Sequence, residues 1–246
     1  MAQPQPTRTR STGTFPLVLM YHSVSSCSQD PYRVTVGPDR FEQQLRWLRR
    51  HGLRGTSMRE LLDAESTGHS RGLIGLTFDD GYADFGETVL PALRRYGFTA
   101  TVFVLAERLG GHNAWDPEGP RKALMTAEEV RRVAADGMEV GSHGMLHQPL
   151  GSVSEAALLD EVRRSRTVLE RITGQDVRGF CYPYGDVSER VIETVRSTGY
   201  DYGCAIWNSA LSGRYALPRT YVGDRDRALR LHAKRLRHEW TSRVRR

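Results

Sequence analysis

A short apolar run that stops at two adjacent carboxylates constrains the fold of this chain more than any other feature. Leu73 to Phe78 has the length and composition of a buried strand, and Asp79, Asp80 and Gly81 follow it directly. In α/β folds, the carboxyl ends of the strands carry the functional side chains. Two neighbouring carboxylates repel each other unless a cation or a shared proton compensates. The sequence therefore predicts a functional site where this strand ends.

A histidine pair can provide the cation that offsets the repulsion between the two carboxylates, because it can hold a metal ion. His143 and His147 are separated by three residues and follow the strand-like run Met138 to Gly141. This position predicts that they lie at the same end of the sheet as the two aspartates. Two imidazoles and one carboxylate leave open positions for water and substrate, and they suit zinc or a similar divalent ion. No cysteine stands at a spacing that suggests a fourth ligand.

Glycines mark a repeated alternation of helix and strand. Helical patterns stop at Gly52, Gly97, Gly137 and Gly199, and the last three of these glycines precede apolar strand-like runs. The alternation is typical of an α/β fold in which helices wrap parallel strands. Predicted helix starts are Thr126-x-x-Glu129, Ser152-x-x-Glu155 and the looser Asp186-x-x-Glu189. We assign Glu161, like the glutamates of these helix starts, to a first turn or a solvent-exposed face, with no catalytic role.

Length and composition favour one soluble globular domain. The chain has 246 residues, of which 39% are hydrophobic and 26% charged. Residues 1–14 are polar and predict a flexible lead-in, residues 15–224 form the predicted domain, and residues 225–246 form a basic helix or tail. Three cysteines at no metal-ligand spacing favour a reducing compartment. Phe15 to Tyr21 is too short for a typical signal-peptide core, so we expect a cytoplasmic protein without a transmembrane segment.

The basic C-terminal segment has two interpretations. Residues 225–246 contain nine arginines or lysines and two acidic residues. Such a segment could bind nucleic acid or anionic lipid, but runs of charge are more often solvated helix faces. No interleaved aromatic residues or nucleic-acid motif supports the first interpretation, so nucleic acid is not an expected partner.

Three motifs in a fixed order resemble a known family. Thr77 to Gly81, Ser142 to His147 and Phe180 to Gly185 are similar to the three successive motifs of the NodB-like polysaccharide deacetylases, which are carbohydrate esterases. The resemblance extends over roughly residues 15–222. It implies a single distorted (β/α) barrel and a metal-dependent hydrolase that removes acetyl groups from an N-acetylated sugar or glycan.

The resemblance also implies roles for individual residues. Asp79 would be the general base, and Asp80, His143 and His147 would hold a divalent metal, most simply Zn²⁺. The backbone N–H of Tyr184 would stabilise the oxyanion. This division fits the physics, because a carboxylate next to a metal is neutralised while its free neighbour can accept a proton.

Two departures from the family pattern leave residues to assign. The arginine that orients the catalytic aspartate is missing from the third motif, and Arg178 or Arg219 could replace it, with Arg219 favoured because it follows an apolar strand-like segment. The late histidine motif is also missing. His232 has similar neighbours but lies in an arginine-rich helical pattern, whereas His22 ends an apolar strand. The strand that ends in His22 resembles the histidine motif of family members in which the order of the motifs is circularly permuted to the N-terminus. We therefore predict that His22 is the general acid.

Other functions remain open at this point. An amide hydrolase acting on a small acetylated biosynthetic intermediate would fit a protein without a secretion signal. A catalytically silent carbohydrate-binding protein could use the same fold. The presence of Asp79 argues against this alternative, because inactive versions can dispense with the general base. The oligomeric state and the identity of the acetylated substrate are not encoded in any of these motifs.

Overall fold

The computed structural model describes residues 15–243, so the lead-in expected over residues 1–14 and the last three residues lie outside the described part. The strands are β1 (Val18–Tyr21), β2 (Ser23–Val24), β3 (Thr35–Val36), β4 (Arg54–Thr56), β5 (Leu73–Phe78), β6 (Thr101–Val104), β7 (Glu139–Ser142), β8 (Gly179–Cys181), β9 (Tyr202–Cys204) and β10 (Thr220–Tyr221). The α-helices are α1 (Pro38–Arg50), α2 (Met58–Ser66), α3 (Leu90–Tyr96), α4 (Ala127–Ala135), α5 (Glu155–Leu159), α6 (Ser165–Thr173), α7 (Glu189–Ser197) and α8 (Ala228–Arg243). Residues 15–243 also contain three short helices: η1 (Phe85–Val89), η2 (Asp160–Arg164) and η3 (Pro183–Gly185).

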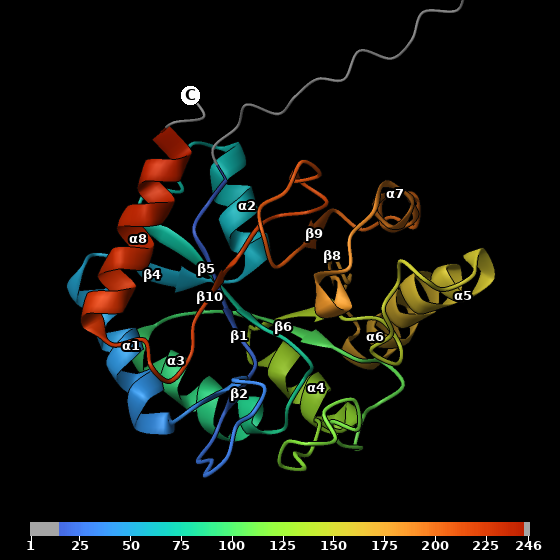
Figure 1. Cartoon of the computed structure of the whole chain (residues 1–246), viewed down its shortest axis with the longest axis horizontal. Coiled ribbons are helices and arrows are strands. Elements are labelled where there is room, and N and C mark those ends of the chain that lie inside the picture. The colour runs from blue at the N-terminus through green and yellow to red at the C-terminus, as the bar shows by residue number, and fades with distance from the viewer. Residues whose placement is uncertain (1–14, 244–246) are drawn as a thin grey trace, which may run out of the picture.

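Seven parallel strands form a curled sheet in the order β10-β1-β5-β6-β7-β8-β9, and β4 pairs with the first half of β5. Leu217, just before β10, forms a parallel bridge with Cys204 at the end of β9, while β10 itself pairs with β1. The two edges of the sheet therefore meet. Figure 1 shows the strands at the centre with helices around them. The prediction of parallel strands wrapped by helices in a distorted barrel is confirmed.

Side chains alternate between the inside and the outside of the curled sheet because a strand has a period of two residues. Phe103, Cys181 and Tyr202 pack together in an inner cluster whose further members include three residues of α2: Met58, Leu61 and Leu62. The neighbouring strand residues, such as Val102 and Phe180, belong to the larger cluster beneath the outer helices. Alternation along β7 places Glu139, Gly141 and the following His143 on the inner side. The strand pattern thus directs polar residues at the strand ends toward one central space.

Helix boundaries follow local signals, with two corrections. Gly97 ends α3 in the left-handed conformation, with φ of 65°, and Thr126 and Glu129 form the predicted capping box of α4. The predicted caps of two later helices were wrong. Ser154 caps α5 in place of Ser152, and Ser188 caps α7 in place of Asp186. In both cases a serine directly precedes the first helical residue, so its hydroxyl reaches the N–H three residues later.

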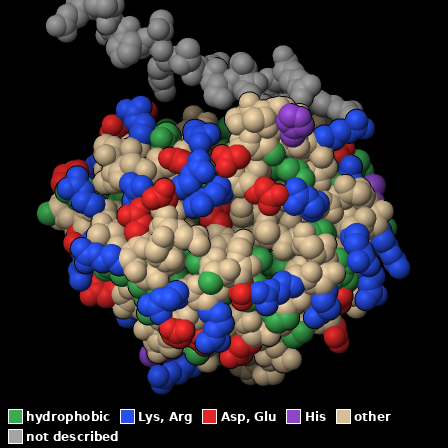
Figure 2. Space-filling model, turned by 180° about the vertical axis from the view of Figure 1, so that it is seen from behind, with side chains coloured by type: hydrophobic (Ala, Val, Ile, Leu, Met, Phe, Trp, Pro, Cys, Tyr) green, Lys and Arg blue, Asp and Glu red, His purple; other side chains and the backbone are tan. Residues whose placement is uncertain are grey.

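The predicted basic segment forms α8, which packs against α1 at the side of the barrel (Figure 1). Figure 2 shows the face of the molecule opposite to this view, where basic and acidic side chains are interspersed and hydrophobic side chains occur only in small groups. Among residues 15–243, no helix combines the length and the apolar character needed to cross a membrane.

Candidate active site

Four of the predicted site residues follow the carboxyl ends of the parallel strands β1, β5 and β7. Asp79 and Asp80 follow β5, His143 follows β7, and His22 follows β1. His147 lies in the loop after β7, and Arg219 directly precedes β10, which pairs with β1. Because all these strands are parallel, residues that are far apart in the sequence meet at one end of the sheet.

Arg219 holds Asp79 through two parallel hydrogen bonds. The Nη1 and Nη2 atoms of Arg219 donate to Oδ1 and Oδ2 of Asp79 at 2.6 and 2.7 Å. The guanidinium is fully enclosed, and it also donates to Thr77 Oγ1, the carbonyl oxygen of Ala205 and Cys181 Sγ. Such a bidentate pair fixes the plane of the carboxylate. Arg178, the other arginine considered, pairs with Asp63 and Asp201 and does not contact Asp79.

Asp79 is held in its charged form. Burial by itself raises the pKa of this carboxyl group, but the charge and hydrogen bonds of Arg219 outweigh burial and lower the pKa below its usual value. His22 Nε2 lies 3.9 Å from Asp79 Oδ2, and the imidazole is only slightly exposed. The Nδ1 atom of His22 is buried without a hydrogen-bond partner among the described residues. His22 therefore lies beside the charged carboxylate of Asp79.

Asp80 points to a different set of partners. His143 Nε2 and His147 Nε2 lie 3.2 and 3.3 Å from the same oxygen, Asp80 Oδ1. Within the described part of the chain, that oxygen is buried and accepts no hydrogen bond of acceptable geometry. Three possible ligand atoms of a metal thus converge on one buried position. The three residues could hold one cation.

The backbone fixes the tautomer of His143. Its Nδ1 atom lies 2.8 Å from the carbonyl oxygen of Cys181, and a carbonyl can only accept, so Nδ1 carries the proton. In the neutral ring, Nε2 then presents its lone pair to Asp80, as ligating histidines do when a second residue binds the other nitrogen. Burial lowers the pKa of His143, but Asp80 and Asp79 raise it above its ordinary value.

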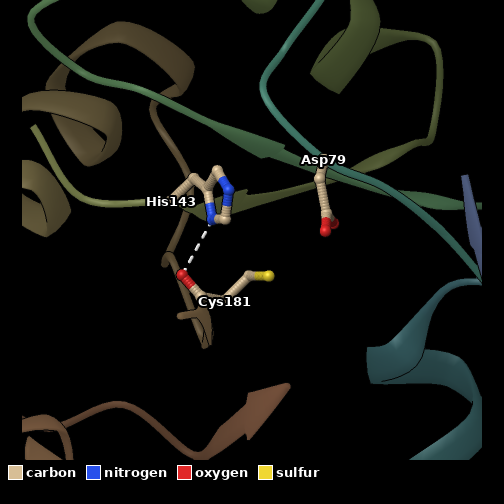
Figure 3. Close-up of side chains that lie close together, drawn as sticks. All are labelled: Asp79, His143 and Cys181. Carbon is tan, nitrogen blue, oxygen red and sulfur yellow. Dashed lines mark hydrogen bonds between the residues drawn. The ribbon is translucent and has the colours of Figure 1, made fainter. Parts of the chain in front are cut away.

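Cys181 is closer to the site than its sequence position indicated. Asp79, His143 and Cys181 form a second group that could bind a metal, and Figure 3 shows these three side chains around one central space. The spacing in the sequence did not indicate this position, which results from the pairing of β8 with β7, but Cys181 does not join Asp80, His143 and His147 as a fourth ligand. Two observations favour the group containing Asp80. Asp79 is already paired with the positively charged Arg219, which disfavours a second cation on it, and burial raises the pKa of the Cys181 thiol well above its usual value.

Backbone strain is concentrated at this site. Among residues 15–243, four residues other than glycine have positive φ, and three of them are Asp80 (72°), His147 (66°) and Tyr184 (59°). Such conformations cost free energy and persist where the surroundings impose them, often at functional sites. The Tyr184 ring contacts His147 edge-on at 4.4 Å between centroids, and Trp115 stacks on the same imidazole at 4.6 Å. The loop between β6 and α4 thus contributes Trp115 to the site.

Glu161 was wrongly assigned to a solvent-exposed face. It is 4% exposed, and its Oε2 atom accepts hydrogen bonds from the backbone N–H groups of Met145 (2.6 Å) and Leu146 (3.3 Å), between the two candidate histidine ligands. A β-carbon at Gly144 would lie 2.7 Å from the same oxygen. The helical pattern around Glu161 gave no sign of this contact, because it depends on where η2 packs. Glu161 therefore supports the loop from behind.

Replacing Glu161 with leucine is expected to weaken metal binding by about 10- to 100-fold, the range typical for loss of a group that positions ligands. The two backbone N–H groups would lose their acceptor, and the loop would no longer hold His143 and His147 together. Glu161→Gln is the matched control, because its side-chain carbonyl can still accept these bonds. Metal titration by calorimetry compares the two variants. Equal metal affinity of Glu161→Leu and the unmodified protein would show that the loop does not depend on this contact.

His232 does not join the site. It is exposed on α8, and its ring lies 6.3 Å from that of His51 at the end of α1. Two aromatic residues near strand ends differ in exposure: the side chain of Trp207, after β9, is 69% exposed, and that of Tyr82, after β5, is 1% exposed. The structure thus brings together all the predicted site residues: Asp79, Asp80, His22, His143, His147, Tyr184 and Arg219.

Comparison with known proteins decides the family. The sequence profile described as polysaccharide deacetylase matches residues 67–203, which include the aspartate pair, both candidate histidine ligands and the third motif. The chain belongs to the polysaccharide deacetylase family. It is therefore a hydrolase of this family, as the three motifs predicted.

Relatives and solved structures agree with this membership. Bacillus subtilis (strain 168) YxkH is 28% identical over 210 residues, covering 83% of this chain and 70% of the relative. The poly-beta-1,6-N-acetyl-D-glucosamine N-deacetylase of Staphylococcus aureus (strain MRSA252) is 23% identical, covering 81% of this chain and 71% of the relative. The structure of the Streptococcus pyogenes deacetylase PplD in complex with acetate superimposes with a TM-score of 0.77 at 23% identity, covering 90% and 98% of the two chains. This deacetylase shares the fold of the chain.

Proposed function

We propose that this polysaccharide deacetylase is a metal-dependent hydrolase that removes acetyl groups from an N-acetylated glycan. The observation that carries the proposal is the pair of adjacent carboxylates with separate partners. Asp79 is ionised beside Arg219 and His22, while Asp80 faces two imidazole nitrogens. One carboxylate is thus available for proton transfer and the other for holding a cation.

Asp80, His143 and His147 would hold the metal, and their donor set suits zinc. A divalent ion there would lower the pKa of a water molecule and polarise the acetyl carbonyl group. Asp79 accepts the proton of the attacking water, and Arg219 keeps the carboxylate charged and oriented for this transfer. The backbone N–H of Tyr184 donates to the oxyanion. His22 protonates the amine as the C–N bond breaks, which releases acetate and the free amino sugar.

The substrate class is proposed from the relatives. The Staphylococcus aureus relative is named for poly-beta-1,6-N-acetyl-D-glucosamine, so oligomers of that polymer are the first substrates to test. Trp115 and the half-exposed Tyr184 flank the site and offer aromatic surfaces for a sugar ring. An acetate-release assay should compare these oligomers with chito-oligosaccharides, peptidoglycan fragments and small N-acetyl sugars. Turnover restricted to the small sugars would instead favour the small-intermediate hydrolase.

Replacing both His143 and His147 with alanine is expected to abolish stoichiometric metal binding, and Asp80→Asn is expected to weaken it. Elemental analysis of dialysed protein measures both effects, with His232→Ala as the histidine control. Binding should also weaken as the pH falls, beginning above the ordinary histidine pKa of about 6.5, because the protonated imidazole cannot ligate and the pKa of His143 is raised. Full metal occupancy in the double variant would rule out these ligands.

A further inference from the structure

Helix α8 carries an apolar stripe that faces solvent. Leu229, Leu236 and Trp240 are 87%, 51% and 65% exposed, and Ala233 between them is also exposed. Their spacing of four, three and four residues places them in one row along the helix. The opposite side packs on the protein, because Leu231 is 4% exposed and packs in the main core. The row is therefore not an extension of the core.

Two arginines whose charge is not balanced by an ion pair flank this row. Helical spacing places Arg230 and Arg237 beside the row on the same side of α8, and neither forms an ion pair or side-chain hydrogen bond within residues 15–243. Lys234 and Arg235, by contrast, bind Asp226 and Glu239. A helix with leucine and tryptophan on one face and free arginines beside it has the composition of an interfacial membrane helix.

A cavity of about 920 Å³ adjoins the arginine side of the helix. Arg230 and Arg237 line it together with Arg33 and Arg225 from neighbouring loops. The acidic residues in its wall are already engaged: Asp30 and Asp224 accept backbone N–H groups, and Asp226 accepts from Lys234. The wall thus carries four arginines and Lys234 against three aspartates, and within residues 15–243 none of the four guanidinium groups forms an ion pair. Guanidinium groups bind phosphate oxygens through paired N–H donors.

We propose that α8 is a docking surface for an anionic lipid bilayer, with the apolar row at the level of the acyl boundary and the arginine-lined cavity receiving a lipid phosphate. The positive charge of residues 225–246 complements such a surface. Two alternative occupants fit less well. Residues 1–14 contain no leucine, isoleucine, valine or aromatic side chain to bury the row. A second copy would bring the same excess of arginine to the interface.

Co-sedimentation with vesicles tests the proposal on the full chain. Phosphatidylcholine vesicles are compared with vesicles that also contain phosphatidylglycerol, at low and high salt. We expect binding only with phosphatidylglycerol, and weaker binding at high salt. Leu229→Ser/Leu236→Ser/Trp240→Ser and, separately, Arg230→Gln/Arg237→Gln should each lower the vesicle affinity by roughly tenfold or more.

Matched controls isolate the helix from general effects. Trp207→Ser removes a tryptophan of similar exposure elsewhere, and Arg132→Gln/Arg171→Gln removes the same charge from α4 and α6, so both should keep vesicle binding within about twofold. Acetate release from a soluble substrate should be unchanged in all variants, which separates this proposal from the catalytic one. No vesicle binding, equal binding without phosphatidylglycerol, or binding that survives the triple substitution overturns the proposal. A lipid-independent dimer that Trp240→Ser dissociates would instead identify the row as a self-association surface.

Discussion

Asp79→Asn is expected to lower kcat by about 100- to 10,000-fold while metal remains bound, because the proton acceptor is lost and Asp80, His143 and His147 are unchanged. The structure adds a second consequence. The substitution leaves the enclosed guanidinium of Arg219 without its counter-charge, and removal of one partner of a buried ion pair typically costs about 3–5 kcal/mol of stability. Acetate release, metal content and the free energy of unfolding should be measured on the same preparation.

A double variant separates the two consequences. In Asp79→Asn/Arg219→Gln the unpaired charge is gone, so stability should partly recover while activity stays low. This outcome would assign the loss of turnover to the missing base and not to a damaged fold. Activity of Asp79→Asn within a few-fold of the unmodified protein would contradict the proposed role.

His22→Ala is expected to lower kcat on an amide substrate by about 100- to 10,000-fold, or roughly 3 to 5 kcal/mol of transition-state stabilisation, with metal content unchanged. The geometry behind this expectation is the placement of His22 Nε2 at 3.9 Å from Asp79 Oδ2. The loss should shrink on an activated acetyl ester, whose leaving group departs with little protonation. Measurement of kcat on both substrates tests this difference.

His232→Ala is the matched control for this experiment, since His232 lies on α8 beside His51 and away from the aspartates. It should behave as the unmodified protein on both substrates. If His22→Ala is nearly silent, or reduces amide and ester turnover equally, protonation of the departing amine must come from another group.

Local sequence signals were sufficient for the central strand and for the chemical character of the site. The apolar run Leu73–Phe78 became β5 with the same bounds, since a buried strand needs an unbroken apolar segment. The sequence alone was enough to associate the aspartates with the histidines, because each group follows a strand and parallel strands end at one edge of the sheet. Family membership rests on the same motifs.

Contacts between distant segments required the tertiary structure. Arg219 and Asp79 are 140 positions apart, and their pairing depends on how Leu217 and β10 join the two edges of the sheet. Two arginines were plausible partners in the sequence, where Arg219 was favoured, and the structure shows that Arg219 pairs with Asp79 while Arg178 pairs with Asp63 and Asp201. Cys181 likewise reaches His143 through the neighbouring strand and not through any spacing in the chain.

The sequence by itself determined which residues could hold a metal or transfer a proton, because these properties belong to single side chains. It also determined which segments form strands, because the hydrophobic pattern of a strand is contained in a few consecutive residues. Burial was decided only by packing. The sequence around Glu161 fits a solvated helix, whereas the structure encloses its side chain behind the histidine loop. The leucines of α8 look like core residues until the helix is docked, when Leu231 is buried and Leu229 faces solvent. Hydrophobic periodicity defines the faces of a helix, but the neighbouring elements determine which face the core receives.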